Sequence, residues 1–272
     1  MSRAFRFGVG IHSIKNPGAL REKVRRLEGF GFDVLNVPDH LGAPAPFPAL
    51  AAVAASATTA RVGTYVLNAC FYKPALLARD AAALEVLSEG RLDLGLGAGY
   101  VREEFEAAEI PYPSARERVD YLEHVTAYLR EHLPRVPILI AGNGDRLLTV
   151  AARHADIVGL TGANPRGFGD PLAERVEFIR AVAGDRFGNL ELDLAITAVP
   201  TDNSGRPNLS LTRRYAPHLS DEELMALPAV LSGSPRDIAD TLRRYRDVYG
   251  LTSFSVQAGH AEGFSKVIAE LR

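Results

Sequence analysis

Residues 74–100 read PALLARDAAALEVLSEGRLDLGLGAGY, and this stretch decides the fold class. Pro74 opens a long helical pattern, which the Ser-Glu-Gly run at 88–90 closes. Residues 91–96 follow directly as a short apolar run that is typical of a buried strand. Small residues and glycines then end the strand at 97–99. The order of helix, strand and glycine turn predicts one unit of a parallel sheet.

The same alternation continues on both sides of this stretch. The predicted strands are residues 5–9, 33–37, 61–67, 91–96, 137–141, 156–160, 190–199 and 253–257. The predicted helices are residues 17–27, 48–58, 74–87, 116–133, 145–154, 171–182, 234–249 and 262–271. Residues 201–228 have an irregular pattern, apart from a short helix predicted at 221–227.

Eight strands that alternate with helices indicate right-handed βαβ units around a parallel sheet. At a length of 272 residues, this number favours a single closed (β/α)8 TIM barrel over an open doubly wound sheet. No shift in composition marks a boundary, so we expect one domain over residues 1–272.

Composition limits the classes of function. The chain has 31 Lys and Arg against 33 Asp and Glu, a balance that argues against nucleic-acid binding and against a polybasic membrane surface. No targeting segment opens the chain, and its most apolar stretch, residues 49–57, is too short to span a bilayer. Cys70 is the only cysteine, and no HxH or HExxH spacing occurs, so we expect no metal site. We therefore expect a soluble, cytoplasmic protein that acts on a small molecule.

In a barrel of this kind, functional residues lie where the strands end. Asp39 and His40 come directly after the second predicted strand. Histidine moves protons near neutral pH, which makes His40 a candidate acid or base. The same dipeptide also fits a loop histidine beside a helix-capping aspartate.

Two glycine-rich turns follow other strands. The first turn consists of Gly97, Ala98, Gly99 and Tyr100, and its glycines would let a ligand approach the backbone. Tight packing of strand against helix explains the same glycines equally well. The second turn, residues 142–144, opens a helix and therefore presents free N–H groups to an anion. An ordinary Asn-Gly turn is the alternative there.

Taken together, these segments resemble the bacterial luciferase-like superfamily of flavin and deazaflavin oxidoreductases. The matching motifs are, in order, 28–40 (EGFGFDVLNVPDH), 59–67 (TARVGTYVL), 74–80 (PALLARD), 87–100 (LSEGRLDLGLGAGY), 137–144 (PILIAGNG), 155–158 (ADIV) and 233–240 (GSPRDIAD). The family fold is a (β/α)8 barrel that binds FMN or coenzyme F420 at its carboxyl-terminal mouth. The Asp-His pair and the Gly-Asn-Gly turn are most similar to the F420-dependent branch.

The resemblance also implies roles for individual residues. His40 would be the acid or base, and Asp39 would contact the deazaflavin ring or its side chain. Tyr65 and Val66 would be joined by a non-proline cis peptide bond behind the ring, and Asn68 would contact the ring edge. The other implied cofactor contacts are Gly97, Ala98, Gly99 and Tyr100, which would line the site, and Gly142, Asn143 and Gly144, which would hold the phosphate.

We therefore expect a coenzyme F420-dependent oxidoreductase that transfers a hydride between the deazaflavin and a small organic substrate. The sugar-phosphate dehydrogenases of this family have Glu at the position of Tyr100 and a Trp shortly after the His. This chain has no Trp, and both departures argue against a sugar phosphate as its substrate. An FMN-dependent luciferase-like monooxygenase and a non-catalytic flavin- or deazaflavin-binding protein are the alternatives. The resemblance also implies a homodimer that pairs through the Ala-rich residues 48–60.

Overall fold

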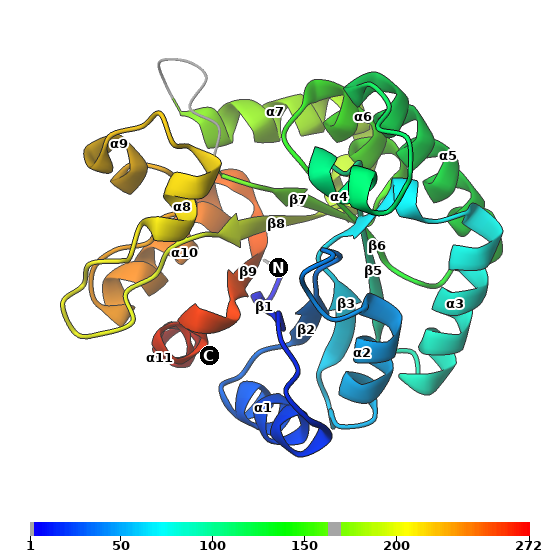
Figure 1. Ribbon diagram of the computed structural model, residues 1–272. Helices are drawn as coiled ribbons and strands as arrows, with labels where there is room; N and C mark the ends of the chain where they lie inside the picture. Colours follow the sequence, from blue (N-terminus) through cyan, green and yellow to red (C-terminus); the bar gives the residue numbers. More distant parts are fainter. Residues whose placement is uncertain (1–2, 163–169) are drawn as a thin grey trace.

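The strands of the computed structural model, which describes residues 3–162 and 170–272, form a closed parallel barrel (Figure 1). The strands are β1 (Arg6–Gly10), β2 (Val34–Val37), β3 (Arg61–Thr64), β4 (Leu67–Asn68), β5 (Leu92–Gly97), β6 (Ile138–Ala141), β7 (Ile157–Leu160), β8 (Glu191–Ile196) and β9 (Leu251–Gln257). Their order is β3-β2-β1-β9-β8-β7-β6-β5-β4, and β3 also pairs with β5, which closes the ring. Because β3 and β4 both pair with β5, they share one of eight positions. The predicted TIM barrel is confirmed.

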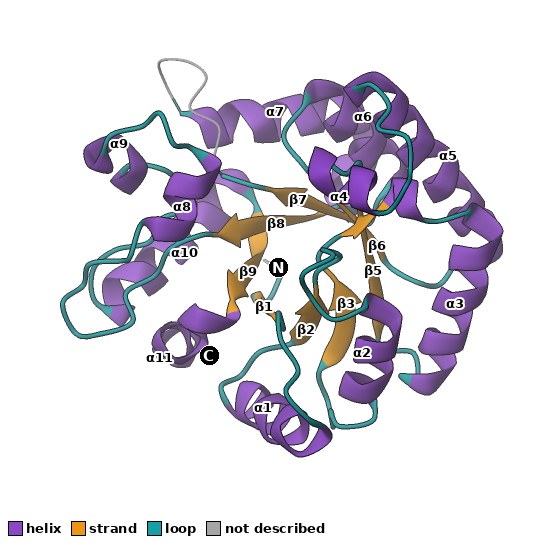
Figure 2. Cartoon of the chain, in the orientation of Figure 1, coloured by secondary structure: helices purple, strands orange, loops and turns teal. Residues whose placement is uncertain are grey.

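Figure 2 shows the helices packed around the outside of the strands. The helices are α1 (Pro17–Gly29), α2 (Pro46–Ala54), α3 (Pro74–Leu87), α4 (Arg102–Ala107), α5 (Ala115–His132), α6 (Asp145–His154), α7 (Pro171–Ala183), α8 (Ser210–Tyr215), α9 (Asp221–Met225), α10 (Pro235–Tyr249) and α11 (Ala261–Leu271). Helix α10 illustrates how sequence sets these limits: Ser234 and Asp237 form a capping box at its start, and Gly250 ends it with a φ of 76°.

Several predicted limits differ from the structure. The third predicted strand, 61–67, is divided into β3 and β4 at Tyr65–Val66, where the predicted cis peptide bond is present. The predicted helix 48–58 begins two residues earlier and ends at Ala54, and the predicted strand 190–199 ends at Ile196. Helices α4 and α8 were not expected, because each is a single short segment without a clear apolar period.

The segment between β8 and α10 has a small core of its own. Its buried apolar residues, separate from the main core, are Ala198, Ala216, Leu219, Leu224, Leu227 and Val230. A bridge between Ala198 and Val230 and a 2.8 Å hydrogen bond from Thr197 N to Ala229 O join the two ends of the segment. The short helices α8 and α9 are therefore held beside the end of β8 (Figure 1).

Candidate active site

His40 follows β2 at the carboxyl-terminal mouth of the barrel, and it is paired with a carboxylate. Its Nδ1 lies 2.9 Å from Glu104 Oε1, and the same oxygen accepts a 3.3 Å hydrogen bond from Leu41 N. The His40 side chain is 46% exposed, whereas that of Glu104 is only 18% exposed. One ring nitrogen is thus engaged by a largely buried carboxylate, while the rest of the ring reaches the mouth.

Glu104 comes from helix α4, and an aromatic cluster holds this helix in place. The ring of the fully buried Phe105 lies edge-on to Phe71 at 5.2 Å and to Tyr112 at 5.0 Å. The Arg118 guanidinium stacks over the Tyr112 ring at 4.3 Å and donates a 2.9 Å hydrogen bond to Gly99 O. The sequence reasoning missed Glu104, because a single buried aromatic residue gives α4 no recognisable period.

Asp39 precedes His40 in the chain and anchors the neighbouring strand. Its Oδ2 accepts a 3.0 Å hydrogen bond from Asn68 N at the end of β4. Burial raises the pKa of the Asp39 carboxyl, although hydrogen bonds from Asn68 N and the Tyr72 hydroxyl act in the opposite direction. The buried Asn68 in turn accepts from Cys70 N at 3.1 Å, so its side chain caps the short turn that follows. The alternative of Asp39 as a helix cap is therefore wrong.

The Tyr65–Val66 peptide lies between these groups and the barrel interior. The Tyr65 hydroxyl donates a 2.5 Å hydrogen bond to Asp193 Oδ2 on β8, on the far side of the barrel. Asp193 is 1% exposed and also accepts from Ser255 Oγ at 3.1 Å. Burial raises the pKa of the Asp193 carboxyl. The Tyr65 ring therefore crosses the barrel just below the mouth.

The glycines of β5 are explained by close packing against this peptide. A Cβ atom at Gly97 would lie 2.8 Å from Val66 Cγ2, and one at Gly99, whose φ is +71°, would overlap the Asn68 side chain. Of the two interpretations of this turn, tight packing is the one the geometry supports directly. Ala98 is half-buried above these glycines, and the Tyr100 side chain is 65% exposed at the rim.

The turn at 142–144 joins β6 to helix α6. Gly144 is the N-cap of α6, no side chain caps the helix, and a Cβ at Gly144 would meet only open space. Asp145 is turned toward Arg175 of α7, so its carboxylate is paired outside the turn. The Asn143 side chain bonds both the hydroxyl and the backbone N–H of Thr161, directly after β7. The first turn of α6 can therefore receive an anion.

The structure thus places all the sequence-predicted site residues at the carboxyl ends of neighbouring strands β2, β4, β5 and β6. Two further histidines lie at the mouth, His12 after β1 and His260 after β9. Burial lowers the pKa of both imidazoles. The buried His260 Nδ1 has no hydrogen-bond partner among the residues described.

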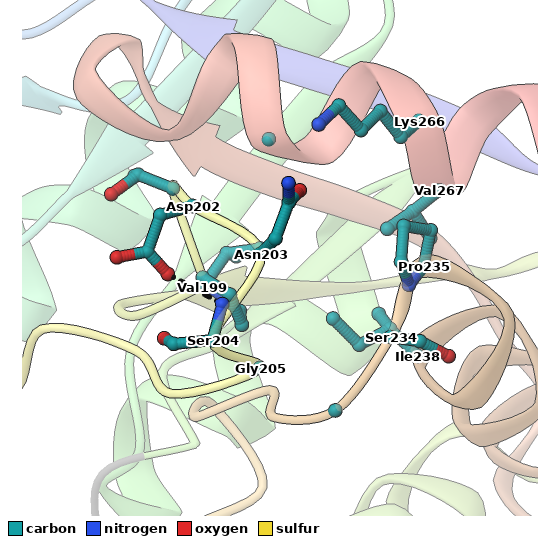
Figure 3. A pocket seen from close by; sticks show the side chains of 14 residues that line it. Val199, Asp202, Asn203, Ser204, Gly205, Ser234, Pro235, Ile238, Lys266 and Val267 are labelled. Carbon is teal, nitrogen blue, oxygen red and sulfur yellow. Dashed lines mark hydrogen bonds between the residues drawn. The ribbon is translucent and has the colours of Figure 1, made fainter.

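A cavity of about 410 Å³ lies elsewhere, between the loop after β8, the start of α10 and α11 (Figure 3). Asn203 and Lys266 are at its edge, and no sequence-predicted site residue lines it. Within residues 3–162 and 170–272, no three His, Cys, Asp or Glu side chains are grouped to hold a metal ion. In the same ranges, every helix is too short or too polar for a membrane span.

Comparison with known proteins identifies relatives of this chain. An F420-dependent glucose-6-phosphate dehydrogenase from Amycolatopsis mediterranei is 33% identical over 175 residues, which is 52% of each chain. A 5,10-methylenetetrahydromethanopterin reductase from Archaeoglobus fulgidus is 28% identical over 60% of this chain and 55% of its own length. The chain thus aligns with about half the length of these two relatives.

Among solved structures, an F420-dependent secondary alcohol dehydrogenase in complex with an F420–acetone adduct superposes with a TM-score of 0.79. The match covers 99% of this chain and all of the other at 16% identity, which establishes a common fold. The model of the luciferase-like monooxygenase family matches residues 3–206. This match covers more than half of the chain, which therefore belongs to the luciferase-like monooxygenase family.

Proposed function

We propose that this protein is a coenzyme F420-dependent oxidoreductase that transfers a hydride between the deazaflavin and a small organic substrate. The observation that carries the proposal is the 2.9 Å contact of His40 Nδ1 with Glu104 at the mouth of the barrel. An accessible imidazole that a largely buried carboxylate holds in place is suited to general acid–base catalysis.

His40 would exchange the proton that accompanies hydride transfer. Because Nδ1 is occupied by Glu104, Nε2 is the nitrogen that remains for a substrate oxygen or nitrogen. In alcohol oxidation, Nε2 would take the hydroxyl proton, and in the reverse reaction the protonated ring would return it. The bound deazaflavin would supply or accept the hydride, which no amino-acid side chain can do.

The residues around His40 fit a ring system with a phosphate-bearing tail. The uncapped first turn of α6 and the open space beside Gly144 would accept the phosphate. Asp39, Asn68 and the Tyr65–Val66 peptide would position the ring beside His40. Gly97, Ala98, Gly99 and Tyr100 would form the neighbouring wall, while Gly142 and the backbone of Asn143 would complete the phosphate turn.

The relatives support this choice of cofactor over FMN. The dehydrogenase from Amycolatopsis mediterranei is named as F420-dependent, and so is the alcohol dehydrogenase that shares the fold. The family name favours the second candidate, an FMN-dependent monooxygenase. The two candidates differ in whether the enzyme consumes oxygen.

A fluorescence titration with F420 and with FMN tests the cofactor. We expect binding of F420 in the low-micromolar range or tighter, and much weaker binding of FMN. Turnover is then measured as reduction of F420 by small alcohols and as reoxidation of reduced F420 by ketones and enones. Preferential FMN binding with oxygen consumption would overturn the proposal.

The substitution His40→Ala tests the acid–base role. We expect turnover to fall by about 10²–10⁴-fold while F420 binding is retained. The matched control is His132→Ala, since His132 is also exposed but stacks on Tyr128 at the end of α5. Full activity of the His40→Ala protein would refute the role of His40 and leave the cofactor assignment intact.

We also propose that the protein is a homodimer that pairs through α2. Ala52 on this helix and Ala55 directly after it are exposed, and small side chains allow two helices to approach closely. Light scattering at micromolar concentration is the measurement, and a mass of one chain would contradict the proposal.

A further inference from the structure

Glu104 contacts both the side chain and the backbone of the His40 loop. Its Oε1 lies 2.9 Å from His40 Nδ1 and accepts a 3.3 Å hydrogen bond from Leu41 N. An ionised carboxylate has only acceptors, so the imidazole must donate in this contact. When the ring is neutral, its single N–H is then the one on Nδ1.

We propose that Glu104 is a positioning residue that holds neutral His40 in the Nδ1–H tautomer and thereby aims the Nε2 lone pair at the substrate. The inference rests on the proposed function only for its kinetic consequence. The hydrogen bond made by one ring nitrogen determines the state of the other, so the carboxylate sets which atom exchanges the proton.

Within residues 3–162 and 170–272, Glu104 is the only carboxylate within hydrogen-bond distance of the His40 ring. Asp39, the adjacent residue, accepts a 3.0 Å hydrogen bond from Asn68 N instead. Glu103, the neighbour of Glu104 on α4, is exposed and makes no side-chain hydrogen bond among the described residues. Glu103 and Glu104 are chemically identical, and only the position of Glu104 on α4 brings its carboxylate to His40.

The support behind Glu104 is rigid enough to fix the ring. Phe105, which follows it, is fully buried between Phe71 and Tyr112. The Glu104 side chain is itself only 18% exposed, so packing restricts the positions that its carboxylate can take. A catalytic group whose supporting contacts are packed in this way holds its orientation without substrate.

Nitrogen-15 NMR of the histidine side chains tests the tautomer without cofactor or substrate. The spectrum is recorded at mildly alkaline pH, where imidazoles are neutral. The signals of His40 are assigned by their loss in the His40→Gln protein, since the chain has seven histidines. We expect the proton on Nδ1 in the wild type and in Glu103→Ala, and its transfer to Nε2 in Glu104→Ala. An Nε2–H wild type, or a Glu104→Ala protein that keeps Nδ1–H, would overturn the proposal.

A second variant separates orientation from the integrity of the loop. Glu104→Gln keeps an acceptor oxygen for both His40 and Leu41, so we expect it to retain the Nδ1–H tautomer. Glu104→Ala should lose about 10²-fold in kcat with unchanged F420 affinity, and Glu104→Gln should recover most of that loss. Equal loss in the two variants, or a loss confined to cofactor binding, would contradict a positioning role. Absence of F420 turnover in the wild type would refute the proposed function alone, because the tautomer is measured independently.

Discussion

The two ends of the barrel surround an aspartate in opposite ways. At the amino-terminal end, Asp93 of β5 is paired with Arg6 and with Arg61, whose Nε lies 2.8 Å from Asp93 Oδ1. At the carboxyl-terminal mouth, Asp39 accepts a hydrogen bond from the uncharged Asn68 N–H, and burial raises its pKa. Two guanidiniums keep a carboxylate ionised, and the resulting ion pairs stabilise that end of the barrel. The protonation of a carboxylate among neutral donors still depends on what lies next to it, as is common in binding sites.

The largest effect is expected at the amino-terminal end. Asp93→Ala would leave Arg6 and Arg61, both largely buried, without their shared carboxylate. We expect the free energy of unfolding in urea to fall by about 3–5 kcal/mol. The control Asp240→Ala removes a surface pair with Arg243 and should change stability by at most about 1 kcal/mol. Similar losses in the two proteins would show that Asp93 has no special structural role.

A moderate effect is expected at the turn 142–144, where we propose that the cofactor phosphate binds. Gly144→Asp would add a negative charge at the uncapped start of α6. We expect F420 binding to weaken at least about tenfold, or about 1.4 kcal/mol, with little change in stability. Gly188→Asp is the matched control, because a side chain at Gly188 also meets open space but far along the chain from the site. Fluorescence titration measures both proteins, and unchanged affinity of the Gly144→Asp protein would exclude this turn as the anion seat.

The smallest effect concerns the pH dependence of stability at Asp39. Because its folded-state pKa is raised above 3.8, the folded protein holds the proton more tightly than the unfolded chain does. This difference in pKa contributes stability that is fully present at pH values below the pKa of Asp39 in the unfolded state. The contribution is lost as pH rises through the pKa of Asp39 in the folded state. Asp39→Asn should therefore gain stability relative to the wild type as pH increases from about 4 to 7. Denaturant midpoints at several pH values provide the measurement. If the stability of Asp39→Asn relative to the wild type fell with rising pH, the sign of the prediction would be contradicted.

The barrel was predictable from sequence because its strands are continuous apolar runs. All six residues of β5 are buried, and such a run is readable without knowledge of its neighbours. The cis peptide bond at Tyr65–Val66 was expected only from the family resemblance, and the division of the third strand there was not predicted, since nothing in the residue pattern marks it.

The missing parts of the site depend on contacts between distant residues. Glu104 meets His40 across 64 positions of the chain, and no local pattern encodes that approach. The Asn143 side chain is bound by Thr161, which β7 brings beside β6, so the sequence alone could not show that its amide was occupied. The glycines of β5 were visible, but their packing against Val66 required coordinates.

The separate core of the segment between β8 and α10 has an evolutionary consequence. Its helices pack on their own apolar cluster and return to the barrel through the bridge between Ala198 and Val230. Mutations within such a segment alter its own packing and leave the strand ladders of the barrel untouched. Selection can therefore exchange or lengthen this segment while the strands of the barrel and the order of their pairing are retained.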